Sequence, residues 1–242
     1  MPSTKKKVAL VTGANKGIGF EVARQLGAAG CVVLLGTRNH ALGKEAAAKL
    51  IAEGLDVRYL VIDVTDVSTV AAAAQRIADE FGRLDILVNN AGISDPADGP
   101  ALTARLDAVE RALRTNFLGT LAVTQAMLPM LSASAAGRIV NVSSGLGSLT
   151  RSASPNPSST NLIGYSASKA ALNMLTVQLA RLLHDTTIKV NSAAPGYTAT
   201  ALNGFRGMQT IPEGAAEIVR LALLPDDGPT GTFSESSGVV PW

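Results

Sequence analysis

A tyrosine and a lysine four residues apart, Tyr165 and Lys169, form a pair that can carry out acid–base chemistry. They open an Ala-rich stretch, about residues 165–184, that is typical of a helix, and a spacing of four places both side chains on one helix face. Because a nearby ammonium favours an ionised phenol, we expect Lys169 to lower the pKa of Tyr165 from about 10 towards neutral pH. Such a phenol suits general acid catalysis.

Three glycines, Gly13, Gly17 and Gly19, lie between an apolar run, Val8–Val11, and a stretch typical of a helix, about residues 18–29. Glycine allows a tight turn and lets backbone N–H groups approach a pyrophosphate at the helix N-terminus. The spacing differs from the usual dinucleotide-binding fingerprint. The alternative is that these glycines only connect a strand to a helix.

The end of the second apolar run indicates which dinucleotide fits. An acidic side chain there binds the ribose 2′-OH of NAD, whereas basic side chains accommodate the 2′-phosphate of NADP. Residues 31–40 contain no Asp or Glu and carry Arg38, and Lys16 lies in the glycine turn. We therefore expect the cofactor to be NADPH/NADP+. The alternative is that both cations are solvated surface residues.

Short apolar runs alternate with Ala-rich stretches of helical length along the chain, which predicts an α/β domain whose parallel strands are buried on both faces. With 242 residues, we expect a single domain spanning residues 1–242. The expected strands are Val8–Val11, 32–35, 59–62, 86–88, 139–142 and 188–190. The expected helices cover about residues 18–29, 41–53, 67–81, 103–133, 165–184 and 213–224.

Two segments depart from this pattern. Residues 148–164 are rich in Ser, Thr and Pro, and we expect an inserted irregular loop. Residues 197–211 combine glycines with apolar residues, which predicts a mobile substrate flap. Their apolar content favours a hydrophobic or aromatic compound over a charged sugar as the molecule bound there. Tyr197, Phe205, Met208 and Trp242 are candidates for the pocket lining, although each is equally compatible with local packing.

Composition excludes several classes of function. The formal net charge is +2, and without the run Lys5, Lys6 and Lys7 the basic residues number 18 against 19 acidic ones, so we expect no nucleic-acid partner. No apolar run approaches the roughly 18 residues of a membrane span. A single cysteine forms no internal disulfide, and it favours a cytoplasmic protein. With only two histidines besides, we expect no metal site.

Further motifs complete a resemblance. The segments Asn89–Gly92, Ser143–Ser144 and Pro195–Gly196 follow three of the apolar runs, and Asn116 lies within the expected long helix. Together with Thr12–Gly19, Asp63–Val64 and the Tyr165/Lys169 pair, they resemble the classical short-chain dehydrogenases/reductases in order over nearly the whole chain. Within that family, the segments 15–19, 37–39 and 221–242 look most like NADPH-dependent carbonyl reductases and the menthone and salutaridine reductases.

The resemblance implies a Rossmann-type doubly wound sheet of about seven strands in the order 3-2-1-4-5-6-7. It also implies reduction of a ketone or aldehyde, a small-molecule carbonyl substrate. Tyr165 would protonate the carbonyl oxygen, Lys169 would hold the nicotinamide ribose, Ser144 would orient the carbonyl, and Asn116 would anchor a water of a proton relay. The cofactor-binding residues it implies, besides Tyr165 and Lys169, are Gly13, Asn15, Lys16, Gly17, Ile18, Gly19, Arg38, Asp63, Val64, Asn90, Ala91, Gly92, Pro195, Gly196, Thr198 and Thr200.

Some alternatives stay open. Tyr165 follows Ser144 by 21 positions, more than the family usually has, and the additional length falls in 148–164. Whether the protein is a monomer or a homo-oligomer is therefore undecided. Ser143 is a second candidate for the catalytic hydroxyl, although Ser144 matches the family position. The same residues also suit an NADP-dependent alcohol dehydrogenase that works oxidatively, or a non-catalytic NADP sensor that has the same fold.

Overall fold

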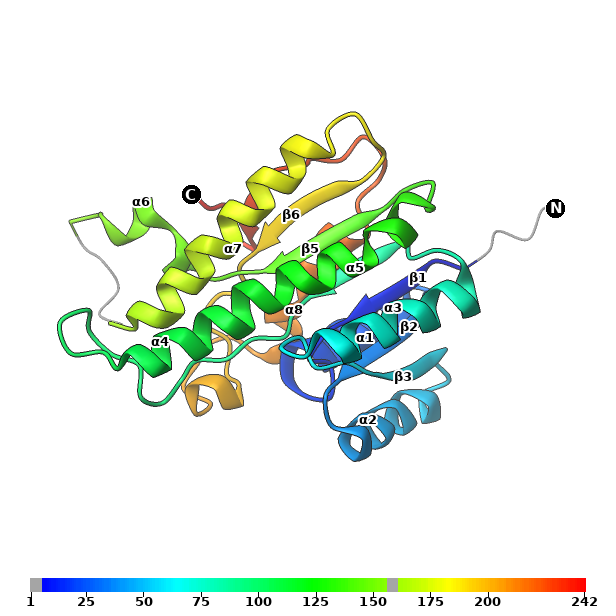
Figure 1. The fold of residues 1–242 in the computed structure, drawn as a ribbon, viewed down its shortest axis with the longest axis horizontal. Helices are drawn as coiled ribbons and strands as arrows, with labels where there is room; N and C mark the ends of the chain where they lie inside the picture. The colour runs from blue at the N-terminus through cyan, green and yellow to red at the C-terminus, as the bar shows by residue number, and fades with distance from the viewer. Residues whose placement is uncertain (1–5, 156–160) are drawn as a thin grey trace.

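The computed structural model of the protein describes residues 6–155 and 161–242. Within these residues the strands form one sheet in the order β3-β2-β1-β4-β5-β6-β7-β8 (Figure 1). All neighbouring strands are parallel except β7 and β8, which form an antiparallel pair. The strands are β1 Val8–Val11, β2 Val32–Thr37, β3 Val57–Val61, β4 Ile86–Asn89, β5 Arg138–Val142, β6 Lys189–Ala193, β7 Phe233–Glu235 and β8 Gly238–Val239. The expected doubly wound sheet and its strand order are confirmed, and β8 extends it.

Helices cover both faces of this sheet (Figure 1). One face packs against α1, α2 and α8, and the other against α3, α5 and α7. The α-helices are α1 Gly17–Ala28, α2 His40–Ala52, α3 Val67–Phe81, α4 Leu106–Leu113, α5 Thr120–Ser132, α6 Leu149–Ser152, α7 Ile163–Leu182 and α8 Ile211–Ala222. A π-helix, η1 Arg114–Gly119, joins α4 to α5, and short 3-10 turns occupy η2 Gly145–Gly147 and η3 Ala201–Asn203.

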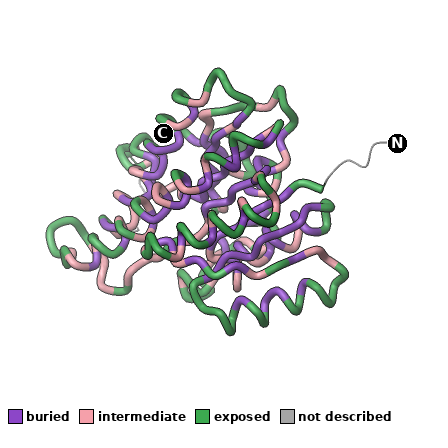
Figure 2. The backbone as a smooth tube through the Cα atoms, turned by 45° about the vertical axis from the view of Figure 1, so that its right-hand side comes forward, coloured by how far each residue is buried: buried purple, intermediate pink, exposed green. Residues whose placement is uncertain are grey.

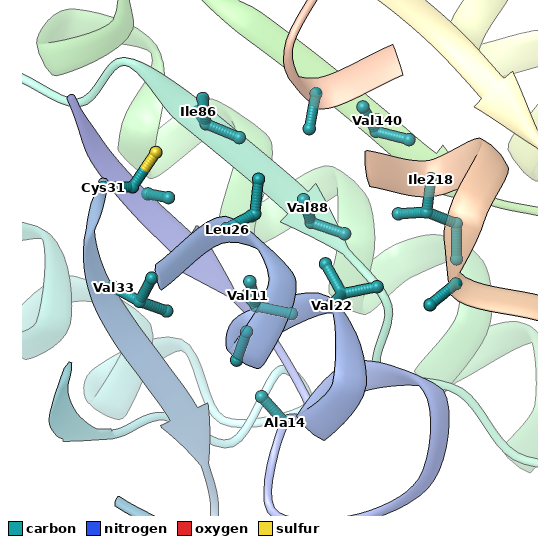
Figure 3. Packing of buried hydrophobic residues seen from close by; sticks show 14 of the residues in the cluster. Val11, Ala14, Val22, Leu26, Cys31, Val33, Ile86, Val88, Val140 and Ile218 are labelled. Atoms are coloured by element: carbon teal, nitrogen blue, oxygen red, sulfur yellow. The ribbon is translucent and has the colours of Figure 1, made fainter. Parts of the chain in front are cut away.

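The central strands β1, β2 and β4 are apolar at almost every position because both faces of the sheet are buried there (Figure 2). In β1 the side chains alternate: Val8 and Leu10 face one layer of helices, whereas Ala9 and Val11 face the other. Figure 3 shows the layer that Ala9 and Val11 face, where Val22 and Leu26 of α1 and Ile218 of α8 pack against the strands. This buried sheet is the rigid support of the residues at its edge.

The structure corrects two sequence-based expectations. The expected helix 103–133 is interrupted by the π-helix η1, in which Asn116 lies. The expected irregular loop 148–164 is wrong at both ends, because Leu149–Ser152 is helical and Ile163 already belongs to α7. Residues 156–160 of that segment lie outside the described residues. The segment 197–211 contains η3 and a bridge between Thr198 and Gln209, and its role as a mobile substrate flap stays a prediction.

Candidate active site

The candidate catalytic pair lies on the first turns of α7, beside the carboxyl end of β5. Lys169 is 4% exposed, and its Nζ donates a hydrogen bond of 2.8 Å to the main-chain oxygen of Val142, the last residue of β5. The Nζ atom lies 5.6 Å from the centre of the Tyr165 ring. Helix α7 therefore presents both side chains to the same edge of the sheet, as their spacing predicts.

The expected lowering of the Tyr165 pKa is wrong for this structure. Burial raises the pKa of the phenol above its usual value of 10, and a hydrogen bond with Ser144 only partly opposes this shift. Burial also lowers the pKa of the Lys169 ammonium to about 8. The sequence reveals the neighbouring cation but not the loss of water around both groups, and this loss is the larger influence on both pKa values.

The structure distinguishes the two serines that follow β5. Ser143 is 1% exposed, and its hydroxyl donates to Oδ1 of Asn173 at 2.6 Å. Ser144 starts the turn η2, where its Oγ accepts a hydrogen bond from the N–H of Leu146 at 3.2 Å. That bond uses a lone pair and leaves the Ser144 proton free to donate, and the hydroxyl lies close enough to Tyr165 to oppose part of the rise in the pKa of the phenol. The geometry favours Ser144 as the reactive hydroxyl.

Asn116 is fully buried inside the π-helix η1, and π-turns of this kind often occur at functional sites. Its side-chain oxygen accepts from the N–H of Ile93 at 2.8 Å. Its Nδ2 donates to the oxygen of Ile93 and to Oγ of Ser168, both at 2.9 Å. The carboxamide therefore ties the loop after β4 to α7. The main-chain oxygen of Asn116 accepts a hydrogen bond from the Thr120 hydroxyl at 3.0 Å. The expected proton relay through a water at Asn116 stays a prediction.

Sequence reasoning missed the residue that caps α7. The residue before this helix, Leu162, forms no side-chain cap, and the N–H groups of the first turn point instead at Asp98. The Asp98 carboxylate accepts from the N–H of Gly164 at 3.0 Å and from that of Tyr165 at 2.8 Å. A carboxylate at a helix N-terminus is favourable for the helix dipole. No local signal reveals this cap, because Asp98 precedes Tyr165 by 67 positions.

A cleft of about 720 Å³ opens at the carboxyl ends of the central strands, where doubly wound folds bind nucleotides. The glycine turn after β1 forms its floor: Gly13 and Gly17 have positive φ angles of 64° and 59°. A Cβ atom at Gly19 would lie 2.3 Å from Nδ2 of Asn90, so only glycine fits there. The turn thus needs its glycines for backbone conformation and for close approach, beyond merely joining a strand to a helix.

Most of the expected cofactor-binding residues line this cleft. The expected residues found there are Gly13, Asn15, Lys16, Gly17, Ile18, Gly19, Arg38, Asp63, Val64, Asn90, Ala91, Gly92, Tyr165, Lys169, Pro195 and Thr200. Gly196 and Thr198 lie in the lining of a neighbouring cavity together with Ser144, and Asn116 lines neither.

Cations gather at one end of the cleft. Lys16 and Arg38 are both exposed and both line it, and neither forms an ion pair within residues 6–155 and 161–242. Asp63, which also lines the cleft, is occupied by hydrogen bonds from the N–H and hydroxyl of Thr65 at 2.9 and 2.8 Å. Two unpaired cations and a glycine turn at a helix N-terminus form a set of donors suited to phosphate groups.

The glycine turn is also held by Thr12, a residue that is not among the expected site residues. The hydroxyl oxygen of Thr12, which is 1% exposed, accepts from the N–H groups of Asn90 and Ala91 at 3.0 Å each. In return, Nδ2 of Asn90 donates to the main-chain oxygen of Thr12 at 2.8 Å. These bonds hold the turn after β1 against the loop after β4. The sequence gives no signal for these hydrogen bonds, because they join residues that lie about 78 positions apart.

A second cavity, of about 1060 Å³, adjoins the cleft, and Tyr165 lines both. Its wall carries Arg151 of α6, whose guanidinium forms a bidentate ion pair with Glu235 of β7 at 2.7 and 3.1 Å. Leu146, Leu162 and Leu202 add apolar surface.

The four candidate lining residues have different environments. Tyr197 lines the second cavity and Phe205 the cleft. Trp242 stacks on Phe233 with ring centres 5.4 Å apart, so it packs against the end of the sheet. Met208 is 89% exposed. Among the described residues no cluster of three metal-ligating side chains occurs, and no helix there is long and apolar enough to cross a membrane.

Known proteins are similar to this chain in sequence and in fold. Salutaridine reductase of Papaver bracteatum is 34% identical over 301 aligned residues, which cover 97% of this chain and 96% of the relative. Carbonyl reductase 1 (NADPH) of Sus scrofa is also 34% identical, over 99% of this chain and 96% of the relative. The solved structure of salutaridine reductase from Papaver somniferum superposes with a TM-score of 0.84 at 32% identity, covering 94% of this chain and 99% of that one.

The family comparison agrees with the geometry. Residues 7–209 match the short chain dehydrogenase family, a range that includes the glycine turn, the Asn89–Gly92 segment, Ser144 and the Tyr165/Lys169 pair. The fold, the strand order and the convergence of these residues at one sheet edge are therefore those of an oxidoreductase related to the NADPH-dependent carbonyl reductases. The chain belongs to the short-chain dehydrogenase/reductase family.

Proposed function

We propose that this protein is an NADPH-dependent carbonyl reductase that converts a ketone or aldehyde to an alcohol, with Tyr165 as general acid. The observation that carries the proposal is the position of Tyr165 between two cavities. The phenol borders the cleft that contains the glycine turn and the second cavity that contains Ser144. A proton donor at this junction is within reach of a substrate in the second cavity and of a cofactor in the cleft.

The residues of the cleft fit a phosphorylated dinucleotide. The backbone N–H groups of the turn 13–19 would bind the pyrophosphate, and Lys16 with Arg38 would bind a 2′-phosphate. Pro195, Gly196, Thr198 and Thr200 would enclose the nicotinamide end, and Asp63, Val64 and Asn90 to Gly92 the adenosine end. NADPH supplies a hydride to the carbonyl carbon when it is bound.

The chain's own groups provide the proton and the polarisation. The raised pKa of Tyr165 keeps the phenol protonated at neutral pH, which is the form a general acid needs. The Ser144 hydroxyl, free to donate, would hydrogen-bond the carbonyl oxygen and orient it towards Tyr165. The Lys169 ammonium, still charged below its pKa of about 8, would stabilise the phenolate left behind. A proton relay through Asn116 would then restore the phenol.

Residues from both 148–164 and 197–211 line the second cavity, which we propose as the substrate cavity. We propose residues 197–211 as the substrate flap. Leu202 and Phe205 of this segment lie in the lining of the cavities, together with Arg151 and Arg206. Because charged and apolar side chains both line the space, the proposed substrate is a small carbonyl compound with an apolar body and a polar group.

The experiment is oxidation of NADPH, with NADH in parallel, against ketones, aldehydes, α-keto esters and isatin. The proposal expects turnover of at least one carbonyl and a preference for NADPH. The corresponding alcohols with NADP+ form the reverse arm, because the same residues serve an alcohol dehydrogenase. Turnover only with NADH, or only of alcohols at neutral pH, contradicts the proposal. Tight NADPH binding without any turnover favours the sensor instead.

A further inference from the structure

The turn that carries Ser144 is held from both ends by one side chain of α7. Asn173 lies one turn beyond Lys169 on this helix. Its Oδ1 accepts the hydroxyl of Ser143 at 2.6 Å, and its Nδ2 donates to the main-chain oxygen of Gly147 at 3.2 Å. These two partners are the residue before Ser144 and the last residue of η2, so the carboxamide bridges the two ends of the turn. We call these two hydrogen bonds of Asn173 the clamp.

The clamp is dry. Asn173 is 4% exposed, Ser143 is 1% exposed, and Gly147 is buried. A buried donor or acceptor that loses its partner costs the full desolvation penalty, so both hydrogen bonds resist opening. The turn also touches the helix directly, since a Cβ atom at Gly147 would lie 2.7 Å from the main-chain carbon of Lys169. Neither end of the turn can shift relative to α7 without breaking one of these contacts.

Ser144 itself has weaker anchors. Its Oγ accepts one hydrogen bond of 3.2 Å, from Leu146 within the same turn. Ser144 and Tyr165 both line the second cavity, where the proposed reaction requires the two side chains to face the same carbonyl oxygen. The direction of the Ser144 hydroxyl therefore depends on where the ends of the turn are held. Ser143 is also held by its N–H bond to Ala193, but Asn173 is the side chain that bonds to both ends. Tyr165, Lys169 and Asn173 share one helix face, so the clamp also sets the register between proton donor and hydroxyl.

We infer that Asn173 is a positioning residue for the proposed carbonyl reduction: it holds the Ser144 hydroxyl in line with the Tyr165 phenol. The catalytic consequence rests on the proposed function, whereas the clamp itself does not. Loss of the clamp lets Ser144 turn away, because the serine then keeps only the bonds from Leu146 and Gly147 within its own turn. A displacement of about 1 Å in such a group costs up to about 100-fold in rate.

The same helix offers a matched control. Thr176, fully buried, lies further along α7, where its hydroxyl accepts from Nδ2 of Asn141 at 2.8 Å and bonds to Ser192 at 2.8 Å. These bonds tie α7 to β5 and β6 but do not reach the Ser144 turn. Thr176→Val therefore removes a buried polar anchor of the same helix and leaves the clamp intact.

The kinetic arm compares Asn173→Ala, Ser144→Ala, the double variant and Thr176→Val, with isatin and NADPH. Asn173→Ala is expected to lower kcat between about tenfold and 100-fold with the NADPH Kd within about twofold of the parent. The double variant should be no slower than Ser144→Ala alone, because both changes remove one function. Thr176→Val should keep the parent kcat. The inference would be overturned if the kcat losses of Asn173→Ala and Ser144→Ala multiplied in the double variant. Equal kcat losses for Asn173→Ala and Thr176→Val would also overturn it.

A second arm needs no turnover. Hydrogen exchange reports on the amides of Leu146, Gly147 and Ser148, which are bonded within the turn. Asn173→Ala should speed their exchange by about tenfold or more, while Thr176→Val should not. If no carbonyl is reduced by the parent protein, the proposed function fails, and this arm still decides whether the clamp exists. Unchanged exchange at these amides contradicts the clamp.

The variant Ser143→Ala removes the same 2.6 Å bond from the other side and leaves α7 unaltered. Ser143→Ala replaces Asn173→Ala in both experiments if Asn173→Ala does not fold. Exchange in the turn should rise, and kcat should fall in the same direction as for the helix variant. A folded Ser143→Ala protein with parent exchange rates and parent kcat would overturn the inference.

Discussion

The carboxylate of Asp98 accepts a hydrogen bond of 2.8 Å from the main-chain N–H of Tyr165, so the loop after β4 caps the helix that carries the candidate proton donor. The other carboxylate oxygen accepts from Gly164 at 3.0 Å. The cap positions the tyrosine's backbone and satisfies two N–H groups that the helix leaves free. It also ties one wall of the second cavity to α7, because Asp98 lines that cavity.

Replacing Asp98 by Ala should therefore reduce both stability and turnover. Loss of a helix cap costs about 1 kcal/mol of unfolding free energy. Asp66 offers a matched control, because its side chain caps α3 through the N–H of Ser68 at 2.9 Å. Asp66→Ala should cost a similar amount in urea denaturation and leave kcat unchanged. Equal kcat values for the two variants would show that the cap on α7 has no catalytic consequence.

Cofactor preference should depend on the two cations of the cleft. Lys16→Ala and Arg38→Ala should each weaken NADPH binding by about tenfold, since a hydrogen bond to a charged group contributes about 1.5–3 kcal/mol and these sites are exposed. NADH binding should change little, because it has no 2′-phosphate. Fluorescence titration of the bound dinucleotide measures both Kd values.

Lys44 provides the control for this experiment. It is an exposed cation of α2 that does not line the cleft. Lys44→Ala should leave both Kd values unchanged, so a general loss of positive charge is separated from loss of a phosphate contact. A parallel weakening of NADPH and NADH binding in the Lys16 and Arg38 variants would exclude recognition of the 2′-phosphate.

The buried Lys169 predicts a pH dependence of stability. Its pKa is about 8 in the folded protein, against 10.5 for a solvated lysine, so between these values the unfolded chain binds more protons. Stability from this group is therefore lowest below pH 8 and rises as the pH increases towards 10.5. Relative to Lys169→Met, the parent should gain about 2 kcal/mol between pH 7 and pH 10.

Urea denaturation of both proteins at four pH values between 7 and 10 measures this difference. Ionisation of groups that lie away from Lys169 occurs in both proteins, and so it cancels in the subtraction. If the free energies of unfolding of the two proteins run parallel across this range, Lys169 is not titrating as a buried ammonium with a lowered pKa.

Much of the fold is readable from the sequence because its signals are local. The runs Val8–Val11 and 86–88 are apolar at successive positions, as both faces of the sheet require, and the stretch 67–81 is a helix in the structure with the same bounds. The glycine turn is local as well, since its glycines meet a conformational need within seven residues. The Tyr165/Lys169 pair follows from helical spacing alone.

The rest depends on contacts between distant parts of the chain. The π-helix at Asn116 accompanies hydrogen bonds to Ile93 and Ser168, which no local pattern encodes. Asp98 and Asn173 show the same limit, because each is an ordinary polar residue until the fold brings its partners close. The Tyr165 pKa was expected to fall because the sequence shows the neighbouring cation, whereas the desolvation that raises it comes from the packed site.

The most direct test of the central claim is Tyr165→Phe, which removes one oxygen atom at the junction of the two cavities. With a carbonyl that the parent protein reduces, NADPH oxidation should fall by about 100-fold or more, the contribution typical of a positioned proton donor. The NADPH Kd should stay within about twofold, because the phenol is one of many groups lining the cleft. Turnover at the parent rate with unchanged NADPH binding would contradict the assignment of Tyr165 as the general acid.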